Sequence, residues 1–249
     1  MELGAQLYTL RKYASSLNDF AETLKKVSDI GYRTVQVSGT CAYEPDWLAE
    51  QLAANDLRCV LTHSDANFMQ ENPATVVDKH KTFACKYIGI GSMPYKLDEY
   101  NTFRDSFKNV ARVFAENDCL LMFHNHAGEF TKSDNGLIYL ERMMNDFTPE
   151  EMGFTLDTYW VQAGGGDPAW WIKKLSGRVS CVHLKDMLHY QGIRMAPIYE
   201  GNMNFDAILA ACAEAGTEYL LIEQDDCYGD DPFDCLALSY KNLSERGFN

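Results

Sequence analysis

No apolar run in this sequence approaches the roughly 20 residues needed to cross a membrane, and residues 1–4 lack the basic start of a signal peptide. Basic residues are also scarce, because 22 Lys and Arg stand against 36 Asp and Glu and give a formal net charge of −14. An acidic surface repels phosphate backbones and anionic lipids. We therefore expect a soluble cytoplasmic protein that binds neither nucleic acid nor membrane.

The eight cysteines include no CxxC pair and no zinc-finger spacing. Cys59, Cys119 and Cys181 fall at or inside short apolar runs, where a free thiol behaves as a small buried hydrophobe. Cys227 and Cys235 are close enough in the sequence to pair, but the low density of cysteines argues against a disulfide framework. We expect eight free thiols and a reducing compartment.

Short runs of β-branched and aliphatic residues recur along the chain, each of a length typical of a strand buried on both faces. They cover residues 3–7, 34–37, 58–62, 87–91, 120–123, 153–156, 179–184 and 219–222. Between them, apolar residues three or four positions apart indicate amphipathic helices. One such helix begins its apolar face at Phe20 and ends at Gly31, and others are centred on residues 103–114, 137–144 and 205–212.

Eight strands in 249 residues give 249/8, or about 31, residues for each unit, which matches a βα unit. The sequence therefore predicts an α/β fold, a single (β/α)8 TIM barrel that spans residues 1–249 as one domain. Residues 6–9 read QLYT where a dinucleotide-binding fold has a glycine-rich phosphate loop, so that fold is disfavoured. The glycines at 164–166 precede Asp167 and Pro168, and we interpret them as a hinge before a helix.

Polar side chains accompany the last four strands of the predicted barrel. His124 follows the fifth strand, Asp157 the sixth and Glu223 the eighth, while His183 lies near the end of the seventh. The carboxyl ends of barrel strands converge at one mouth, where TIM-barrel enzymes place their catalytic groups. Buried carboxylates and imidazoles without partners are costly, so these four require mutual pairing or a cation. Two imidazoles and two carboxylates suit Mn, Co or Zn better than Ca.

The same segments carry a resemblance to a known family. LGAQLYTL at 3–10, GYRTVQ at 31–36, HNHAGEF at 124–130, LDTYW at 156–160, HLKD at 183–186 and EQDD at 223–226 resemble the sugar phosphate isomerase/epimerase family of the xylose isomerase-like TIM barrel superfamily. The resemblance covers essentially the whole chain. It implies one divalent metal ion at the mouth, with Mn, Co or Zn expected first and Mg as an alternative.

The resemblance also implies a set of metal ligands. Members of this family usually hold the ion with a Glu, an Asp, a His and a Glu from strands five to eight, and the chain matches the last three with the Asp, His and Glu described above. His124 stands where the first Glu is expected, so His124 is the implied ligand, with His126 or Glu129 as alternatives. A second departure is Trp160, which stands where related epimerases often have a His.

Such a site supports proton transfer beside a carbonyl, because a divalent ion stabilises the enediolate that forms when the neighbouring C–H loses its proton. We expect a metal-dependent sugar isomerase or epimerase that acts on a keto sugar or keto-polyol, whose carbonyl is bound to the metal. An inosose-dehydratase-like lyase is the alternative on the same site. Glu129 and Glu223 are the predicted acid/base groups.

Lys185 lies two residues beyond the His of strand seven and therefore on the same strand face. We expect its ammonium to act in catalysis by binding a phosphate, a carboxylate or the enediolate oxygen. Pairing with Asp186, Asp157 or another carboxylate of the mouth is equally compatible with the sequence.

Aromatic and imidazole side chains near the strand ends are candidates for binding the substrate. A Trp at a strand end can stack on a sugar face, whereas of Trp170 and Trp171, which follow a helix start, at least one is expected in the core. The predicted substrate-binding residues are Tyr8, His63, His126 and Trp160.

Two other functions fit the same barrel. Phosphodiester hydrolysis requires several metal ions and a basic surface. The chain has only six histidines to serve as ligands, and its net charge is −14, so both requirements argue against this function. A barrel that binds a sugar without catalysis is compatible with the departures at His124 and Trp160, but the remaining ligand set argues for metal chemistry. The expected partner is a small-molecule sugar, and a homo-oligomer is compatible with the sequence.

Overall fold

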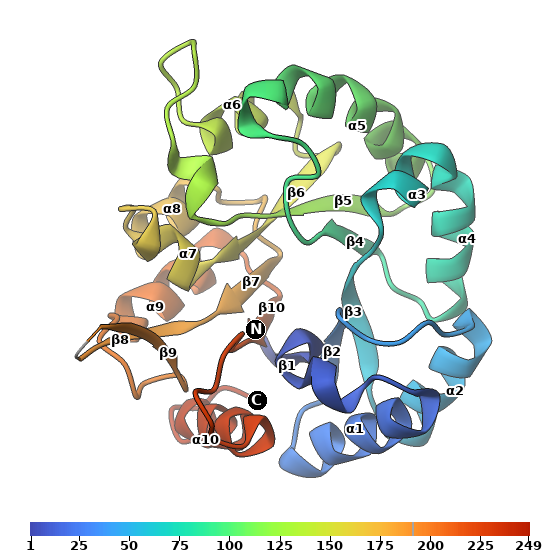
Figure 1. The fold of residues 1–249 in the computed structure, drawn as a ribbon, viewed down its shortest axis with the longest axis vertical. Helices are drawn as coiled ribbons and strands as arrows, with labels where there is room; N and C mark the ends of the chain where they lie inside the picture. Colours follow the sequence, from blue (N-terminus) through green and yellow to red (C-terminus); the bar gives the residue numbers. More distant parts are fainter. Residues whose placement is uncertain (191) are drawn as a thin grey trace.

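Parallel strands close into a barrel, and helices form a layer around it (Figure 1). The computed structural model describes residues 1–190 and 192–249. Within them, eight strands pair side by side in the order β1-β10-β7-β6-β5-β4-β3-β2, and β1 pairs with both β10 and β2 to complete the ring. This confirms the predicted (β/α)8 barrel.

The barrel strands follow the predicted apolar runs to within two residues at each end. They are β1 (Glu2–Gln6), β2 (Thr34–Val37), β3 (Arg58–His63), β4 (Tyr87–Ile90), β5 (Leu120–His124), β6 (Met152–Asp157), β7 (Cys181–Leu184) and β10 (Tyr219–Ile222). Most of their residues are buried, as expected for strands covered on both faces.

The helices lie between successive strands, except for α10, which follows the last strand. The α-helices are α1 (Leu17–Ile30), α2 (Pro45–Ala54), α3 (Ala66–Glu71), α4 (Pro73–Thr82), α5 (Tyr100–Ala115), α6 (Tyr139–Asp146), α7 (Thr158–Ala163), α8 (Pro168–Lys174), α9 (Phe205–Ala215) and α10 (Pro232–Ser244). Three 3-10 helices, η1 (Leu7–Tyr13), η2 (Leu97–Glu99) and η3 (Ala127–Phe130), also lie in the described residues.

Local signals in the sequence explain where several helices begin and end. Ser16 caps α1 by accepting the N–H of Asp19 at 3.2 Å, and Gly31 ends this helix with a φ of +125°. Asp167 caps α8, and Pro168 occupies its first turn. The predicted end of α1 and the predicted start of α8 are therefore confirmed. The glycines at 164–166 were expected to join a strand to a helix, but they join two helices, α7 and α8.

One hairpin was not predicted from the sequence. It consists of β8 (Asp186–His189) and β9 (Ile193–Ala196), which pair antiparallel and stand outside the barrel (Figure 1). Its strands are short and partly exposed, so they lack the apolar run that identifies a barrel strand. The helix predicted around 137–144 is displaced by two residues, because α6 begins at Tyr139 and ends at Asp146.

The barrel has two apolar layers, one inside the ring of strands and one between the strands and the helices. The outer layer contains Trp171, whereas Trp170 is 54% exposed, in agreement with the prediction that at least one of them is core. The inner cluster consists of Val60, Leu61, Tyr87, Met122, Cys181 and Leu221. Because side chains alternate along a strand, residues two positions further on also point inward. Those positions carry the polar groups of the mouth.

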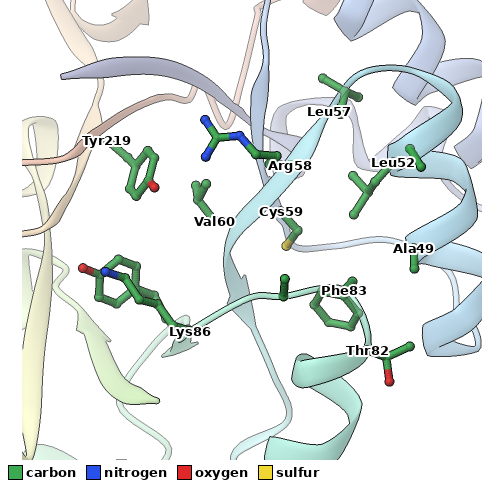
Figure 2. Close-up of a pocket in the computed structure, with 13 residues that line it drawn as sticks. Ala49, Leu52, Leu57, Arg58, Cys59, Val60, Thr82, Phe83, Lys86 and Tyr219 are labelled. Carbon is green, nitrogen blue, oxygen red and sulfur yellow. The ribbon is translucent and has the colours of Figure 1, made fainter. Parts of the chain in front are cut away.

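A hollow of about 370 Å³ lies at the opposite, amino-terminal end of the strands (Figure 2). Apolar groups such as Leu52 line it, and its charged residues are paired, Arg58 with Glu2 and Lys86 with Glu218. This is the end of a TIM barrel that serves stability rather than catalysis. Among residues 1–190 and 192–249, no helix combines the length and apolar character needed to span a membrane.

Candidate active site

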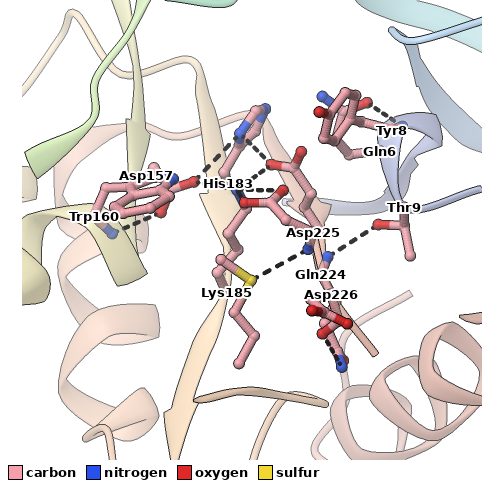
Figure 3. A network of polar contacts seen from close by, with 12 residues as sticks. Gln6, Tyr8, Thr9, Asp157, Trp160, His183, Lys185, Gln224, Asp225 and Asp226 are labelled. Atoms are coloured by element: carbon pink, nitrogen blue, oxygen red, sulfur yellow. Dashed lines mark hydrogen bonds and ion pairs between the residues drawn. The ribbon is translucent and has the colours of Figure 1, made fainter. Parts of the chain in front are cut away.

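The four polar residues singled out at the strand ends meet at the carboxyl end of the barrel. His124 and Asp157 end β5 and β6, His183 is the third residue of β7, and Glu223 directly follows β10. All four are buried, and one nitrogen or oxygen atom from each lies within 4.8 Å of the others. His124 and Glu223 line a cavity of about 600 Å³, and Figure 3 shows the polar contacts around His183 and Asp157.

The backbone fixes the orientation of His124. Its Nδ1 lies 2.9 Å from the carbonyl oxygen of Gly91, so Nδ1 carries the proton and donates it to that carbonyl. Its Nε2 lies 3.1 Å from Oδ2 of Asp157. Burial, together with the nearby charge of His183, lowers the pKa of His124. A neutral His124 therefore directs a lone pair at a carboxylate.

His183 has the same arrangement on β7. Its Nε2 lies 2.6 Å from Oε1 of Gln36, which accepts the proton, and its Nδ1 lies 2.9 Å from Oε2 of Glu223. Among the described residues, neither of these last two atoms makes a hydrogen bond of normal geometry. Burial by itself lowers the pKa of His183, but Glu223 and Asp157 outweigh it and raise the pKa. The two facing atoms therefore need either a proton or another cation between them.

The donor set fits a metal ion. A metal-ligating His usually donates its other N–H to a carbonyl or carboxylate oxygen, and both imidazoles here donate to an oxygen and turn the second nitrogen inward. Of the three candidates on the strand-five segment, His124 lies in the group. Glu129 instead accepts the backbone N–H of His126 at 2.8 Å. Together with Asp157, His183 and Glu223, His124 could hold a metal ion.

Lys185 places a buried ammonium beside this group, with 1% of its surface exposed. Its Nζ lies 3.0 Å from Oδ2 of Asp157 and 2.9 Å from Oε2 of Glu223, and both oxygens of Asp225 accept from it at 2.9 Å. These carboxylates raise the pKa of Lys185 despite burial. Burial favours the protonated carboxyls, but Lys185 and the imidazoles hold the pKa values of Asp157 and Glu223 below their ordinary range. Asp186 instead accepts backbone N–H groups around the hairpin.

The residues predicted to bind substrate line the cavity: Tyr8, His63, His126 and Trp160. The His126 and Trp160 rings are 5.2 Å apart, and Nδ1 of His63 lies 3.2 Å from Oγ of Ser38. Burial and the nearby imidazoles lower the pKa of His63 well below its ordinary value, and burial and His124 lower that of His126 to about 4. Both rings are therefore neutral near pH 7.

Sequence reasoning missed three charged residues of the cavity, Arg11, Asp65 and Asp225. Arg11 lies 4.3 Å above the ring of Tyr8 and donates to the carbonyl oxygen of Asp225 at 2.9 Å. Burial and the like charge of Glu223 raise the pKa of Asp225 to about 6. Asp225 follows Glu223 by two positions, as Lys185 follows His183, so strand parity could have identified it. Arg11 lies in η1, where no strand periodicity applies.

Comparison with known proteins places this geometry in a family. A family model described as xylose isomerase-like TIM barrel matches residues 24–233. A comparison with curated proteins gives no match. A sugar phosphate isomerase/epimerase from Parabacteroides distasonis is similar in structure, with a TM-score of 0.83, 20% identity and coverage of 99% of this chain and 94% of that chain.

Two further solved structures share the fold at lower identity. A probable 3-DHS dehydratase from Bacillus anthracis has a TM-score of 0.74 at 16% identity, and covers 99% of this chain and 100% of its own. A D-allulose 3-epimerase from Methylomonas sp. has a TM-score of 0.75 at 11% identity, with 99% and 98% covered. At these identities the likeness shows the fold, while the match over residues 24–233 shows that the chain belongs to the xylose isomerase-like TIM barrel family.

Proposed function

We propose that this protein is a metal-dependent sugar isomerase or epimerase that moves a proton beside the carbonyl of a keto sugar or keto-polyol. The observation that carries the proposal is the pair of imidazoles, His124 and His183, each with one nitrogen donating to a fixed oxygen and the other facing a carboxylate. His124 of this pair lines a cavity of about 600 Å³, a size suited to a small molecule.

The four-residue group would hold one divalent ion of the Mn, Co or Zn type, which as a Lewis acid would favour loss of the proton next to a carbonyl. The chain itself orients the sugar. Tyr8 and Trp160 offer aromatic faces to the cavity, and His63 and His126 offer neutral imidazoles. Arg11 and Lys185 are its positive groups, and both are held in place by acceptors of the chain.

Glu223 is the proposed acid/base group that lines the cavity, and Lys185 beside it can hold an oxygen that gains negative charge. Glu129 remains the predicted second acid/base group. Its buried carboxylate accepts the N–H of His126, and burial raises its pKa. To reach a substrate, this carboxylate has to leave the His126 amide. Its other role is to hold the loop that carries His126.

The test is exchange of substrate hydrogen with solvent. Candidate ketoses are incubated in deuterated water with Mn²⁺ or Co²⁺, and deuterium at the carbon next to the carbonyl is followed by NMR. The proposed enzyme incorporates deuterium in a metal-dependent manner. Glu223→Gln should slow the exchange by about 100-fold or more, as expected when a general acid/base group is lost.

Glu129→Gln is measured in the same assay. If Glu129→Gln slows the exchange by about 100-fold, Glu129 has an acid/base role. If the exchange slows by less than about tenfold, the role of Glu129 is to hold the loop that carries His126. Loss of water to give an unsaturated product identifies a lyase. Binding of sugar with neither exchange nor dehydration in any metal-loaded sample contradicts the proposed enzyme and favours a sugar-binding barrel.

A further inference from the structure

Two oxygen atoms of the candidate metal site already contact a cation of the chain. Oδ2 of Asp157 lies 3.0 Å from Nζ of Lys185, and Oε2 of Glu223 lies 2.9 Å from the same nitrogen. The same two oxygens are the ones that face the imidazoles, 3.1 Å from His124 Nε2 and 2.9 Å from His183 Nδ1. The ammonium and a divalent ion would therefore share these two acceptors.

Charge makes the sharing unfavourable. An ammonium satisfies its three N–H groups on carboxylates, whereas a divalent ion draws the same oxygens to itself with twice the charge. Two cations a few ångströms apart in a buried site repel strongly, because little water screens them. Only 1% of the surface of Lys185 is exposed, so its ammonium cannot be neutralised by solvent in this position.

Asp225 provides the partner that Lys185 can keep. Both of its oxygens lie 2.9 Å from Nζ of Lys185, and it lies outside the four-residue group that could hold the ion. Its side chain is 24% exposed, against 4% for Glu223, so it stands at the outer edge of the site. The carbonyl oxygen of Asp225 accepts from Arg11 at 2.9 Å, which fixes its backbone.

We propose that Lys185 competes with a divalent ion for the shared oxygens of Asp157 and Glu223, and that Asp225 is the positioning residue that retains the Lys185 ammonium when the ion occupies the site. This inference rests on the metal site of the proposed function. It assigns Lys185 and Asp225 opposite effects on metal affinity. Lys185 lowers the affinity by competing for the shared oxygens, and Asp225 raises it by holding the ammonium when the ion is bound.

The experiment measures binding of Co²⁺ alone to metal-stripped protein, by visible absorption and by titration calorimetry. Lys185→Met keeps the length of the side chain and removes its charge, and it should bind Co²⁺ at least about tenfold more tightly. Asp225→Asn keeps the shape of the side chain but removes its negative charge, so the only charged partners left to the ammonium are the ion's own ligands. This variant should bind Co²⁺ at least about fivefold more weakly. Asp225→Asn retains two ion pairs of Lys185, so it is expected to fold even if Lys185→Met does not.

The double variant, Lys185→Met with Asp225→Asn, tests whether Asp225 acts by positioning Lys185 or only by its own negative charge. If Asp225 acts through Lys185, Asp225→Asn changes affinity less than about twofold when Lys185 is already Met. Asp226→Asn is the matched control, because Asp226 carries the same charge one position away and accepts the N–H of Tyr228 rather than contacting Lys185. The thermal unfolding midpoint of each variant, with and without Co²⁺, gives a second readout of binding that needs no substrate.

Three outcomes would overturn the inference: unchanged or weaker Co²⁺ binding by Lys185→Met, equal weakening by Asp225→Asn in both backgrounds, or equal effects of Asp225→Asn and Asp226→Asn. In each of these, Co²⁺ binding that is lost in His183→Ala leaves the proposed metal site standing. Absence of Co²⁺ binding in the unmodified protein and in Lys185→Met contradicts the metal site itself and, with it, this inference.

Discussion

At the scale of single residues, His80 shows how neighbouring groups set the protonation state of a side chain away from the candidate site. This residue of α4 has 6% of its surface exposed. Its Nδ1 lies 2.7 Å from the carbonyl oxygen of Val76, so Nδ1 donates, and its Nε2 lies 2.7 Å from Oγ1 of Thr62, whose hydroxyl donates to it. A second proton on Nε2 would force that hydroxyl to turn away. Burial lowers the pKa of His80 from 6.5 to about 4.

We expect His80 to make the protein less stable in mild acid. His80 takes up a proton near pH 6.5 in the unfolded chain but only near pH 4 in the folded chain. The contribution of neutral His80 to the free energy of unfolding is therefore complete above pH 6.5 and is lost as the pH falls toward 4. At pH 5 the loss is about 2 kcal/mol. Urea unfolding at pH 7.5 and pH 5.0 measures it, with His80→Asn as the comparison. Equal pH dependence in both proteins would contradict this, since the other histidines titrate in both.

The sequence predicted the residues of the site better than their partners. His124, Asp157, His183 and Glu223 lie at or near the carboxyl ends of consecutive barrel strands, and strand ends can be located from apolar runs alone. The acceptors that orient the imidazoles could not be located, because Gln36 lies on β2 and the Gly91 carbonyl follows β4. These groups become neighbours of the site only through tertiary contacts across the barrel.

At the scale of elements, the prediction succeeded where a local pattern decides the structure and failed where tertiary contacts decide it. The barrel strands are buried on both faces, so their residue types record the burial. The first strand of the β8–β9 hairpin is tied to the segment that follows the hairpin through Asp186, whose carboxylate accepts the N–H groups of Tyr199 and Gly201. Such contacts leave no periodic pattern in the sequence, which explains why the hairpin was not predicted.

The glycines that end α1 and α9 should differ in how much stability is lost when each is replaced by alanine. Gly31 has a φ of +125°, and a Cβ there would lie 2.6 Å from the ring of Tyr240 on α10. Gly216, which ends α9 with a φ of +80°, has open space around the same position. Gly216→Ala should lower the free energy of unfolding by about 1 kcal/mol through backbone strain. Gly31→Ala should lower it by about 2 kcal/mol or more, because the ring must also move. Equal losses in urea unfolding would show that the Tyr240 contact yields without cost.

At the scale of the whole molecule, closing the barrel joins the two ends of the chain and buries most of its thiols. The N–H of Leu3 in β1 donates to the carbonyl oxygen of Asn249 at 2.9 Å, beside the β1–β10 pairing. All eight cysteines lie among the described residues and are free thiols, and six of them are buried, including Cys181 inside the ring of strands. Cys41 and Cys227 are partly exposed. The state of the thiols therefore reports whether the fold is intact.

We expect eight thiols to react with a disulfide reagent such as DTNB when the protein is purified without reductant and unfolded in guanidinium. In the native state at most two, Cys41 and Cys227, should react within minutes, and slowly, because burial raises the pKa of both and to about 12 for Cys227. The remaining thiols react only as fast as the barrel opens. The control is the same protein unfolded with a phosphine reductant that is removed before DTNB is added, and it must also give eight. A count of six without the phosphine and eight with it would reveal a disulfide, for which Cys227 and Cys235 are the candidate pair, and would contradict the expected reducing compartment.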